Sequence, residues 1–213
     1  MSSPARKRQK RPSMENDGSS TQTYPHFATQ AIHAGQDPEQ WKSLAVVPPI
    51  SLSTTFKQHV PGEPLQYEYS RGGNPTRTVF ETCIASLEAA KYAIAASSGL
   101  AAQSTIMQIL NSGDHIVSTG DLYGGTHRQF RLVVSKFGIT SSYIDATDLS
   151  QVEAAIKDNT KMVWVESCAN PLLRMVDLKA LVELVKSKSK DIIVVVDNTF
   201  MTPVLPETAG TGS

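Results

Sequence analysis

The sequence predicts an α/β fold in which a mostly parallel sheet lies between flanking helices. From residue 93 onward, short apolar runs alternate with segments of helical periodicity, which is the pattern of repeated βαβ units. Parallel strands that are joined by helices cross over with a right-handed sense. The apolar run at residues 192–196 ends in Asp197 and has the composition of a buried central strand in such a sheet.

Each element of this fold follows from a local pattern. Strands are expected at residues 93–96, 115–119, 140–144, 162–165 and 192–196. Helices are expected at residues 99–110, 126–137, 149–156 and 178–185. Gly113 and Gly138 lie after the first and second of these helices, and both are expected to be C-caps because glycine tolerates the left-handed backbone found there.

An arm and one earlier helix are expected before the sheet. Residues 44–56 contain Pro48 and Pro49, which neither a central strand nor a helix tolerates, so this stretch is expected to form an extended arm. The Asn-Pro-Thr sequence at residues 74–76 supplies a cap and a first-turn proline, which begin a helix.

Composition favours a protein that works in the cytoplasm. The chain has 213 residues with 20 basic and 20 acidic side chains, and no apolar stretch is long enough to span a bilayer. Its two cysteines and five histidines lack the spacing of a disulfide framework or a metal site, so no metal is expected. The basic cluster at residues 6–11 is interpreted as part of a disordered, solvated leader, in preference to a nuclear address or a nucleic-acid-binding arm.

The candidate chemistry lies in turns that follow the expected strands, because open α/β sheets bind ligands at the carboxyl ends of their strands. Ser98 precedes a helix whose N-terminal amides suit a phosphate, although a serine cap alone is ordinary structure. Tyr123 follows the next strand and either stacks on a planar ring or packs in a turn. Asp197 requires a cation, and the protonated ring nitrogen of pyridoxal phosphate would be a suitable one.

Longer motifs extend this pattern over most of the chain. They are Tyr-Ser-Arg-Gly-Gly-Asn-Pro-Thr-Arg at 69–77, Ser-Gly-Leu-Ala-Ala at 98–102, Tyr-Gly-Gly-Thr at 123–126 and Val-Val-Asp-Asn-Thr-Phe at 195–200, with further stretches at 26–33, 35–41 and 46–57. Through them the chain, from about residue 26 to residue 203, resembles the Cys/Met-metabolism branch of the fold-type I pyridoxal-phosphate-dependent enzymes. The tyrosine-containing motif is specific to that branch, and the arm before it favours the gamma-lyases.

The resemblance implies pyridoxal 5'-phosphate as the cofactor and assigns residues to it. The phosphate would be held by Ser98, Gly99 and Leu100. The ring would contact Tyr123 by stacking, Asp197 at its nitrogen and Asn170 near its hydroxyl.

Further roles implied by the resemblance concern the substrate and a neighbouring subunit. Tyr69 and Arg71 would reach the cofactor phosphate of that neighbour. Arg71, Tyr123 and Arg128 would contact the substrate, and Tyr123 would also act in catalysis. The expected partners are small sulfur amino acids and further copies of the chain, assembled in the family as a dimer of dimers, and neither a membrane nor a nucleic acid is expected.

The implied reaction is γ-elimination of cystathionine, which yields cysteine, 2-oxobutanoate and ammonia. Cystathionine gamma-synthase and O-acetylhomoserine sulfhydrylase share most of the motifs and stay open as alternatives. In the family the chain continues into a Ser-x-Thr-Lys segment whose lysine holds the cofactor, whereas no lysine follows Lys190 here. The chain alone is therefore expected to be inactive, and a second class of function, a non-catalytic fragment that associates with a full-length subunit, stays open.

The expected domain organisation combines these observations. It consists of a disordered basic tail at residues 1–23, an extended arm at 24–70, an incomplete cofactor-binding α/β domain at 71–203 and a divergent tail at 204–213.

Overall fold

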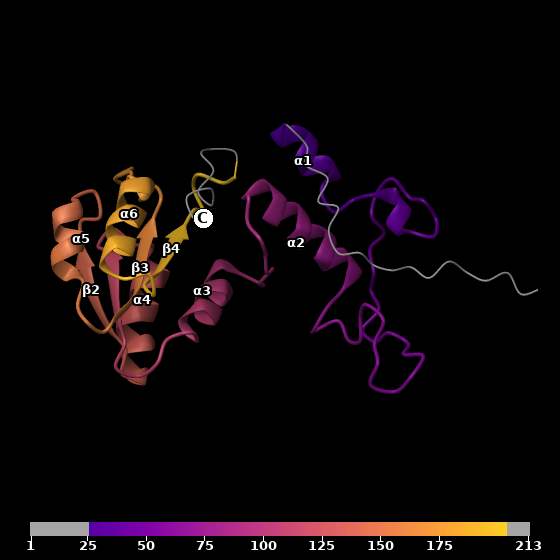
Figure 1. Ribbon diagram of the computed structural model, residues 1–213, viewed down its shortest axis with the longest axis horizontal. Helices are drawn as coiled ribbons and strands as arrows, with labels where there is room; N and C mark the ends of the chain where they lie inside the picture. Colours follow the sequence, from indigo (N-terminus) through magenta and orange to yellow (C-terminus); the bar gives the residue numbers. More distant parts are fainter. Residues whose placement is uncertain (1–25, 204–213) are drawn as a thin grey trace, which may run out of the picture.

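The protein contains a four-stranded parallel sheet with the strand order β2-β1-β3-β4. A computed structural model describes residues 26–203, so the basic tail and the divergent tail lie outside the described residues. The strands are β1 (His115–Thr119), β2 (Thr140–Ile144), β3 (Thr160–Glu166) and β4 (Ile193–Asp197). Every neighbouring pair is parallel, which confirms the predicted fold class (Figure 1).

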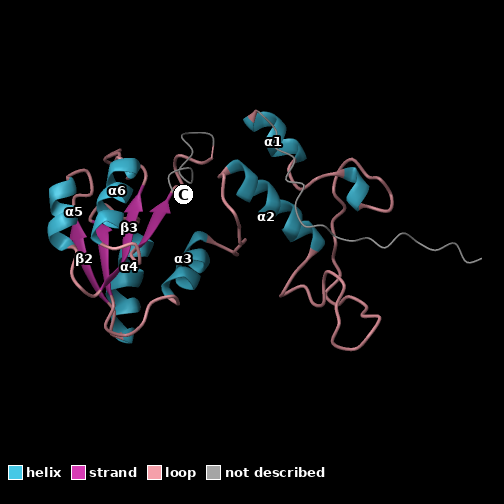
Figure 2. Cartoon of the chain, viewed as in Figure 1, coloured by secondary structure: helices cyan, strands magenta, loops and turns pink. Residues whose placement is uncertain are grey.

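Helices connect and flank the strands (Figure 2). The α-helices are α1 (Phe27–His33), α2 (Pro75–Leu87), α3 (Gly99–Met107), α4 (Gly124–Leu132), α5 (Leu149–Ala155) and α6 (Leu178–Lys188), and the 3-10 turns are η1 (Pro38–Gln40) and η2 (Val134–Phe137). Side-chain caps explain several helix starts, because Asp148 and Asp177 accept hydrogen bonds from the first-turn amides of α5 and α6.

The core forms two apolar layers, one on each face of the sheet. On one face, valines that include Val163 and Val165 pack against Leu181 of α6 and Val152 of α5. On the other face, Trp164 joins residues from α3, α4 and η2. Because successive strand residues point to opposite faces, this alternation fixes which side chains of β3 and β4 face α3 and α4.

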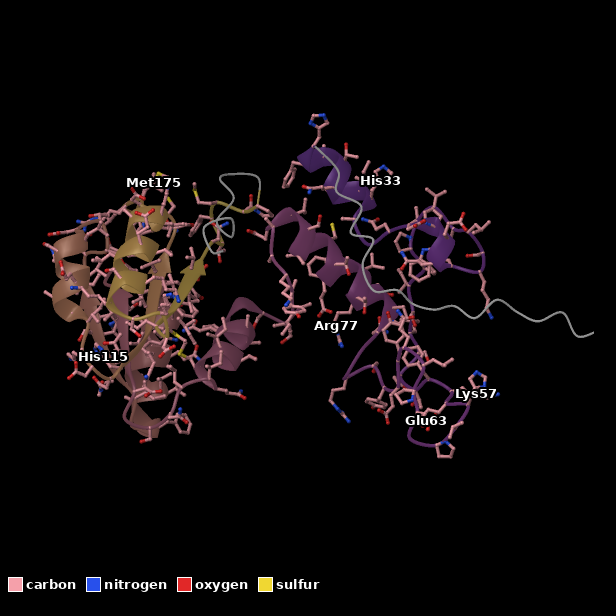
Figure 3. The ribbon with its side chains drawn as sticks, viewed as in Figure 1. His33, Lys57, Glu63, Arg77, His115 and Met175 are labelled. Carbon is pink, nitrogen blue, oxygen red and sulfur yellow. The ribbon has the colours of Figure 1, made fainter. Side chains whose placement is uncertain are left out.

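The arm and α2 form a separate part of the molecule, beside the sheet rather than on it (Figures 1 and 3). Helix α1 packs on α2. The arm is tied to the start of α2, because the Thr76 hydroxyl accepts the Ser51 amide and Asn74 Nδ2 donates to the Ser51 carbonyl. Residues 44–56 contain no helix or regular strand, as predicted, but α1 and η1 were not predicted.

Two strand predictions were wrong, each for a physical reason. Residues 93–96 are not a strand, since no described strand lies beside them to pair with. Instead, the Ala95 amide donates to Glu81 Oε1, and Ile94 is 84% exposed. Strand β4 is half-buried at the edge of the described sheet and is not central, because it pairs with β3 alone.

The two glycine predictions had different outcomes. Gly138 has a φ of +78° and caps η2, which confirms a left-handed C-cap. Gly113 also has a positive φ, +93°, but α3 ends at Met107 with Gln108 as its cap. Gly113 therefore lies in the turn before β1 and is not a helix cap.

Within residues 26–203, no helix is both long and apolar enough to cross a membrane. The same part of the chain holds no group of three or more histidine, cysteine or acidic residues that could bind a metal ion.

A buried histidine gives the fold a specific pH dependence. His115 lies on β1 (Figure 3). It is 0% exposed, with Nδ1 2.8 Å from Thr160 Oγ1 and Nε2 2.9 Å from Ser142 Oγ. Burial, followed by the nearby Lys157 charge, lowers the pKa of His115. The unfolded chain therefore binds a proton at a higher pH than the native state does.

We predict that the free energy of unfolding falls as the pH drops below about 6.5, the ordinary histidine pKa, because the unfolded state then binds more protons. His115→Gln should reduce this dependence, whereas His59→Gln, at an exposed site, should leave it unchanged. Urea unfolding of the three proteins at pH values from about 7.5 to about 5.5 measures the difference. Equal slopes for both variants would contradict the assignment.

Candidate functional site

A cavity of about 620 Å³ opens at the carboxyl ends of β3 and β4, a size typical of small-molecule sites. It lies on the α3 and α4 side of the sheet. Its lining comes from the start of α3, the turn before α4 and the ends of the two strands, and comprises Ser98, Gly99, Leu100, Ala102, Gln103, Ile106, Tyr123, Thr126, Trp164, Glu166, Cys168 and residues 195–200. The structure thus brings together Ser98, Gly99, Leu100, Tyr123 and Asp197, which the sequence analysis selected separately.

The start of α3 forms one end of the cavity. Ser98 is the N-cap, and its side chain accepts the Ala101 amide at 3.1 Å. A Cβ atom placed on Gly99 would meet no atom within 4 Å, so the backbone here is open to a ligand. The free amides and positive dipole end of a nine-residue helix favour an anion at this position.

The Tyr123 ring occupies a position that depends on the glycine two residues later. Tyr123 is the N-cap residue of α4, has no side-chain cap of its own and is 63% exposed. A Cβ atom on Gly125 would overlap Cε1 of the Tyr123 ring and lie 3.0 Å from Cδ1. The ring therefore uses the space that any other residue at position 125 would fill.

Hydrogen bonds from Thr199 fix one carboxylate oxygen of Asp197 and leave the other available to a ligand. Its Oδ1 accepts the Thr199 amide at 3.1 Å and the Thr199 hydroxyl at 2.5 Å. No hydrogen bond to Oδ2 is found from any residue of the described chain. A carboxylate anchored in this way keeps an acceptor for a cationic N–H group.

A second carboxyl, Glu166, lies beside Asp197. The two are register partners in β3 and β4. Glu166 Oε1 accepts the Tyr123 amide at 2.6 Å. The pKa of Glu166 is raised, chiefly by burial and further by the negative charges of Asp197 and Asp121, while the Tyr123 amide acts in the opposite direction.

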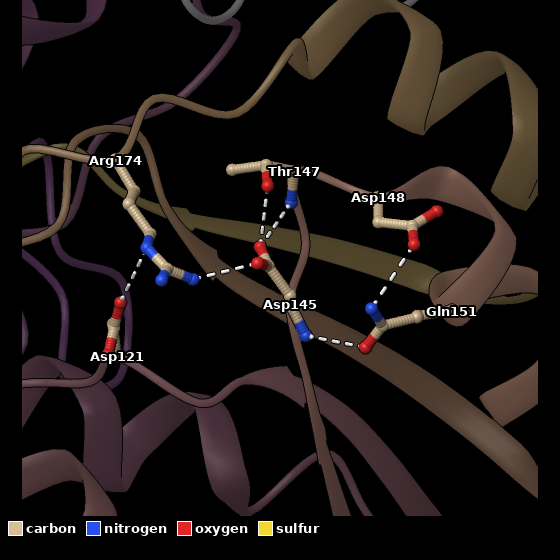
Figure 4. Close-up of polar contacts among 6 residues, drawn as sticks. All are labelled: Asp121, Asp145, Thr147, Asp148, Gln151 and Arg174. Carbon is tan, nitrogen blue, oxygen red and sulfur yellow. Dashed lines mark hydrogen bonds and ion pairs between the residues drawn. The ribbon is translucent and has the colours of Figure 1, made fainter.

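An ion-pair network holds the loops at this edge of the sheet (Figure 4). The Arg174 guanidinium lies 3.5 Å from Asp121 and 2.7 Å from Asp145, in the loops that follow β1 and β2. Hydrogen bonds from Thr147 and the Arg174 charge lower the pKa of Asp145. Because Arg174 follows β3, it ties three loops together, including the loop that leads to Tyr123.

Four residues selected from the sequence lie outside the cavity lining. Asn170 belongs to the loop after β3, where the Asn170–Pro171 peptide is cis, and Arg128 is exposed on α4. Tyr69 and Arg71 line a different pocket, of about 600 Å³, where the arm leads into α2. The Arg71 guanidinium lies 4.7 Å from the centre of the Tyr69 ring.

Several lining residues were missed by the sequence analysis. Glu166 ends β3 as Asp197 ends β4, so an acidic residue at the end of an apolar strand was a signal that could have identified it. Gln103 had no comparable signal, since its role arises from packing between helices: it is 4% exposed and its Oε1 accepts the Thr126 hydroxyl at 3.0 Å. Gln103 Nε2 and Trp164 Nε1 are buried donors without a hydrogen-bond partner in the described chain.

Comparisons with known proteins show which proteins the chain is similar to. The family described as "Cys/Met metabolism PLP-dependent enzyme" matches residues 28–211. Human cystathionine gamma-lyase is 54% identical over 192 residues, which cover 89% of this chain and 47% of that protein. A probable cystathionine gamma-synthase from Herpetosiphon aurantiacus is 45% identical over 177 residues, covering 83% of this chain and 54% of that protein.

The fold is also that of a solved relative. The crystal structure of cystathionine gamma-lyase from Lactobacillus plantarum, complexed with L-serine, superposes with a TM-score of 0.83 at 40% identity. The match covers 88% of this chain and 48% of that chain. The chain thus spans about half the length of the relatives it matches, and its sheet is that of the fold-type I large domain.

We predict that Gly125→Ala displaces the Tyr123 ring, because the added methyl group needs the space that the ring occupies. The affinity for pyridoxal 5'-phosphate should fall about threefold to tenfold, the effect of losing one ring-stacking contact. The free energy of unfolding should stay the same or rise by up to about 1 kcal/mol, because alanine favours a helix.

Gly124→Ala is the matched control, since a Cβ atom there meets nothing within 4 Å. Equilibrium titration with the cofactor and urea unfolding compare the two variants. Equal affinities would show that the ring position does not depend on Gly125.

Proposed function

Because this chain belongs to the Cys/Met metabolism PLP-dependent enzyme family, we propose that it forms much of the cofactor site of an enzyme that cleaves cystathionine by γ-elimination. The products are cysteine, 2-oxobutanoate and ammonia. The observation that carries the proposal is Asp197, whose anchored carboxylate shares one cavity with the helix start at Ser98 and with Tyr123.

The residues present fit pyridoxal 5'-phosphate. The cavity has a helix start suited to an anion, an exposed aromatic ring and a carboxylate at the strand end, which match the phosphate, the flat ring and the ring nitrogen of the cofactor. When bound, the cofactor acts as an electron sink that stabilises negative charge at the substrate α-carbon. Asp197 supports that role by keeping the ring nitrogen protonated.

The other cavity residues orient the cofactor. Ser98, Gly99 and Leu100 bind the phosphate through amides and a hydroxyl, and Tyr123 stacks on the ring and contacts the reacting substrate. Asn170 and Arg128 are proposed to contact the ring hydroxyl and the substrate respectively, and both lie outside the cavity lining of the single chain.

The lack of basic residues in the cavity lining supports assembly with a second copy. Among its lining residues there are two carboxyl groups but no lysine, arginine or histidine, although arginine is a favoured partner of phosphate groups. Arg71 and Tyr69 lie together where the arm leads into α2, apart from the cavity of their own chain. We propose that they complete the phosphate site of a neighbouring subunit in a homo-oligomer, or of a full-length subunit with which this chain associates.

The related reactions differ in their products. Cystathionine gamma-synthase and O-acetylhomoserine sulfhydrylase activity are the alternatives within the family, and one relative carries the name of a probable gamma-synthase. In an assembly of this chain with a full-length subunit, release of 2-oxobutanoate and cysteine from cystathionine alone supports the lyase, whereas turnover that requires an activated homoserine ester supports the alternatives. Both cysteines are free, which is typical of the cytoplasm, the location we propose.

We predict that Asp197→Asn weakens the binding of pyridoxal 5'-phosphate about 10-fold to 100-fold, the usual effect of losing a charge-assisted hydrogen bond. Asp191→Asn, at an exposed site before β4, should bind as the unchanged protein does. Trp164 lines the cavity, so its fluorescence reports binding once Trp41, the other of the two tryptophans, is replaced by phenylalanine. If the fluorescence of both variants is quenched with the same saturation curve, Asp197 does not contribute to cofactor binding.

A mixture of two defective proteins tests whether the site is shared between subunits. Arg71→Ala and Asp197→Asn should each bind the cofactor weakly as a pure protein. When the two are mixed in equal amounts, about a quarter of the sites should combine an intact Asp197 with an intact Arg71 from the other copy. Cofactor titration should then show a tight-binding fraction of that size. If no such fraction appears, Asp197 and Arg71 of different copies do not form one site.

A further inference from the structure

Glu166 is the residue of the cavity whose chemistry is least explained by the proposed cofactor contacts. It ends β3, is 6% exposed and lines the cavity beside Asp197. Its Oε1 accepts the Tyr123 amide at 2.6 Å, which is a short contact for an N–H donor.

The surroundings of Glu166 make an ionised carboxyl group costly. Asp197 on β4 and Asp121 in the loop after β1 both face it with negative charge, and burial acts in the same direction. The Arg174 guanidinium pairs with Asp121 and Asp145, and no ion pair to Glu166 is found among the described residues. A buried carboxyl without a cation contributes little to stability, so its presence points to a role in the site.

The contact with Tyr123 supplies that role. Helix α4 begins at Gly124, and its N-cap residue, Tyr123, provides no side-chain cap, although amides at a helix start need acceptors. Glu166 is a distant acceptor at this start, 43 residues away along the chain. By holding the backbone of Tyr123 it also limits where the side chain of Tyr123 can point, since the ring then lies over Gly125.

We propose that Glu166 is a positioning residue: by accepting the Tyr123 amide, its carboxylate fixes the turn that carries the stacking ring. It acts through Tyr123 and does not itself contact the cofactor ring. The inference rests on the proposed function for the identity of the stacked ligand, but the contact between Glu166 and Tyr123 can be measured without any ligand.

The first test measures that contact in the ligand-free chain. Hydrogen exchange of the Tyr123 amide, followed by NMR, should be about tenfold faster in Glu166→Ala than in the unchanged protein, because the amide loses a charged acceptor. Glu166→Gln keeps the shape and an acceptor oxygen, so it should fall between the two. Glu183→Gln, at an exposed site on α6, is the matched control and should leave the exchange rate unchanged.

The second test asks whether Glu166 affects ligand binding through Tyr123. Glu166→Ala should weaken the binding of pyridoxal 5'-phosphate about tenfold. In a Tyr123→Ala background the same substitution should have little further effect, because the ring that it positions is gone. Glu166→Gln should recover part of the affinity in the presence of Tyr123.

Two results would overturn the proposal. One is an unchanged Tyr123 exchange rate in both Glu166→Ala and Glu166→Gln, and the other is an equal loss of affinity with and without the Tyr123 ring. If Glu166→Ala does not fold, the exchange rate and the cofactor affinity of the isosteric Glu166→Gln test the proposal alone. A protein that shows the exchange effect yet never binds the cofactor would instead contradict the proposed function while leaving the positioning contact in place.

Discussion

The parallel register of β3 against β4 is the constraint on which the candidate site depends. It pairs Glu166 with Asp197, and paired residues of neighbouring parallel strands point to the same face of the sheet. Both carboxyl groups therefore face α3 and α4. A slip of one residue would turn Asp197 toward α5 and α6 and bring an apolar side chain into the cavity. Val194 and Val196, which pack on the α5 and α6 side, oppose such a slip, so the core determines the charge of the site.

The cavity has an electrostatic polarity that follows from this register. One end holds two carboxyl groups on adjacent strands, and the other end is the N-terminus of α3, with its partial positive charge. A ligand that is cationic at one end and anionic at the other complements both. Pyridoxal 5'-phosphate has this distribution when its ring nitrogen is protonated, so the charges of the cavity complement those of the proposed cofactor.

The parts of this structure that the sequence predicted are those set by local pattern. Strands β1 and β2 were predicted at their observed bounds, because each is a short run between turn residues. Tyr123 and Asp197 line one cavity because the ends of parallel strands meet at one edge, whereas Ser98 reaches the same cavity at the start of α3 although no strand precedes it in the described chain. Residues 93–96 have strand composition too, but a strand also needs a neighbour, and composition does not show one. Gln103 was missed because only the packing of α3 near α4 brings it to the cavity.

The Tyr123 turn shows how the fold arranges a flexible group before any ligand arrives. The ring itself is exposed, so packing does not hold it. Its backbone, however, is held by Glu166 from β3, and the preceding loop is held by the Arg174 pair with Asp121. Gly125 then leaves the ring a place to lie. If Tyr123 stacks on the cofactor as proposed, a restrained backbone leaves less conformational entropy to be lost on binding, and part of the affinity would then originate in contacts that the ligand never makes.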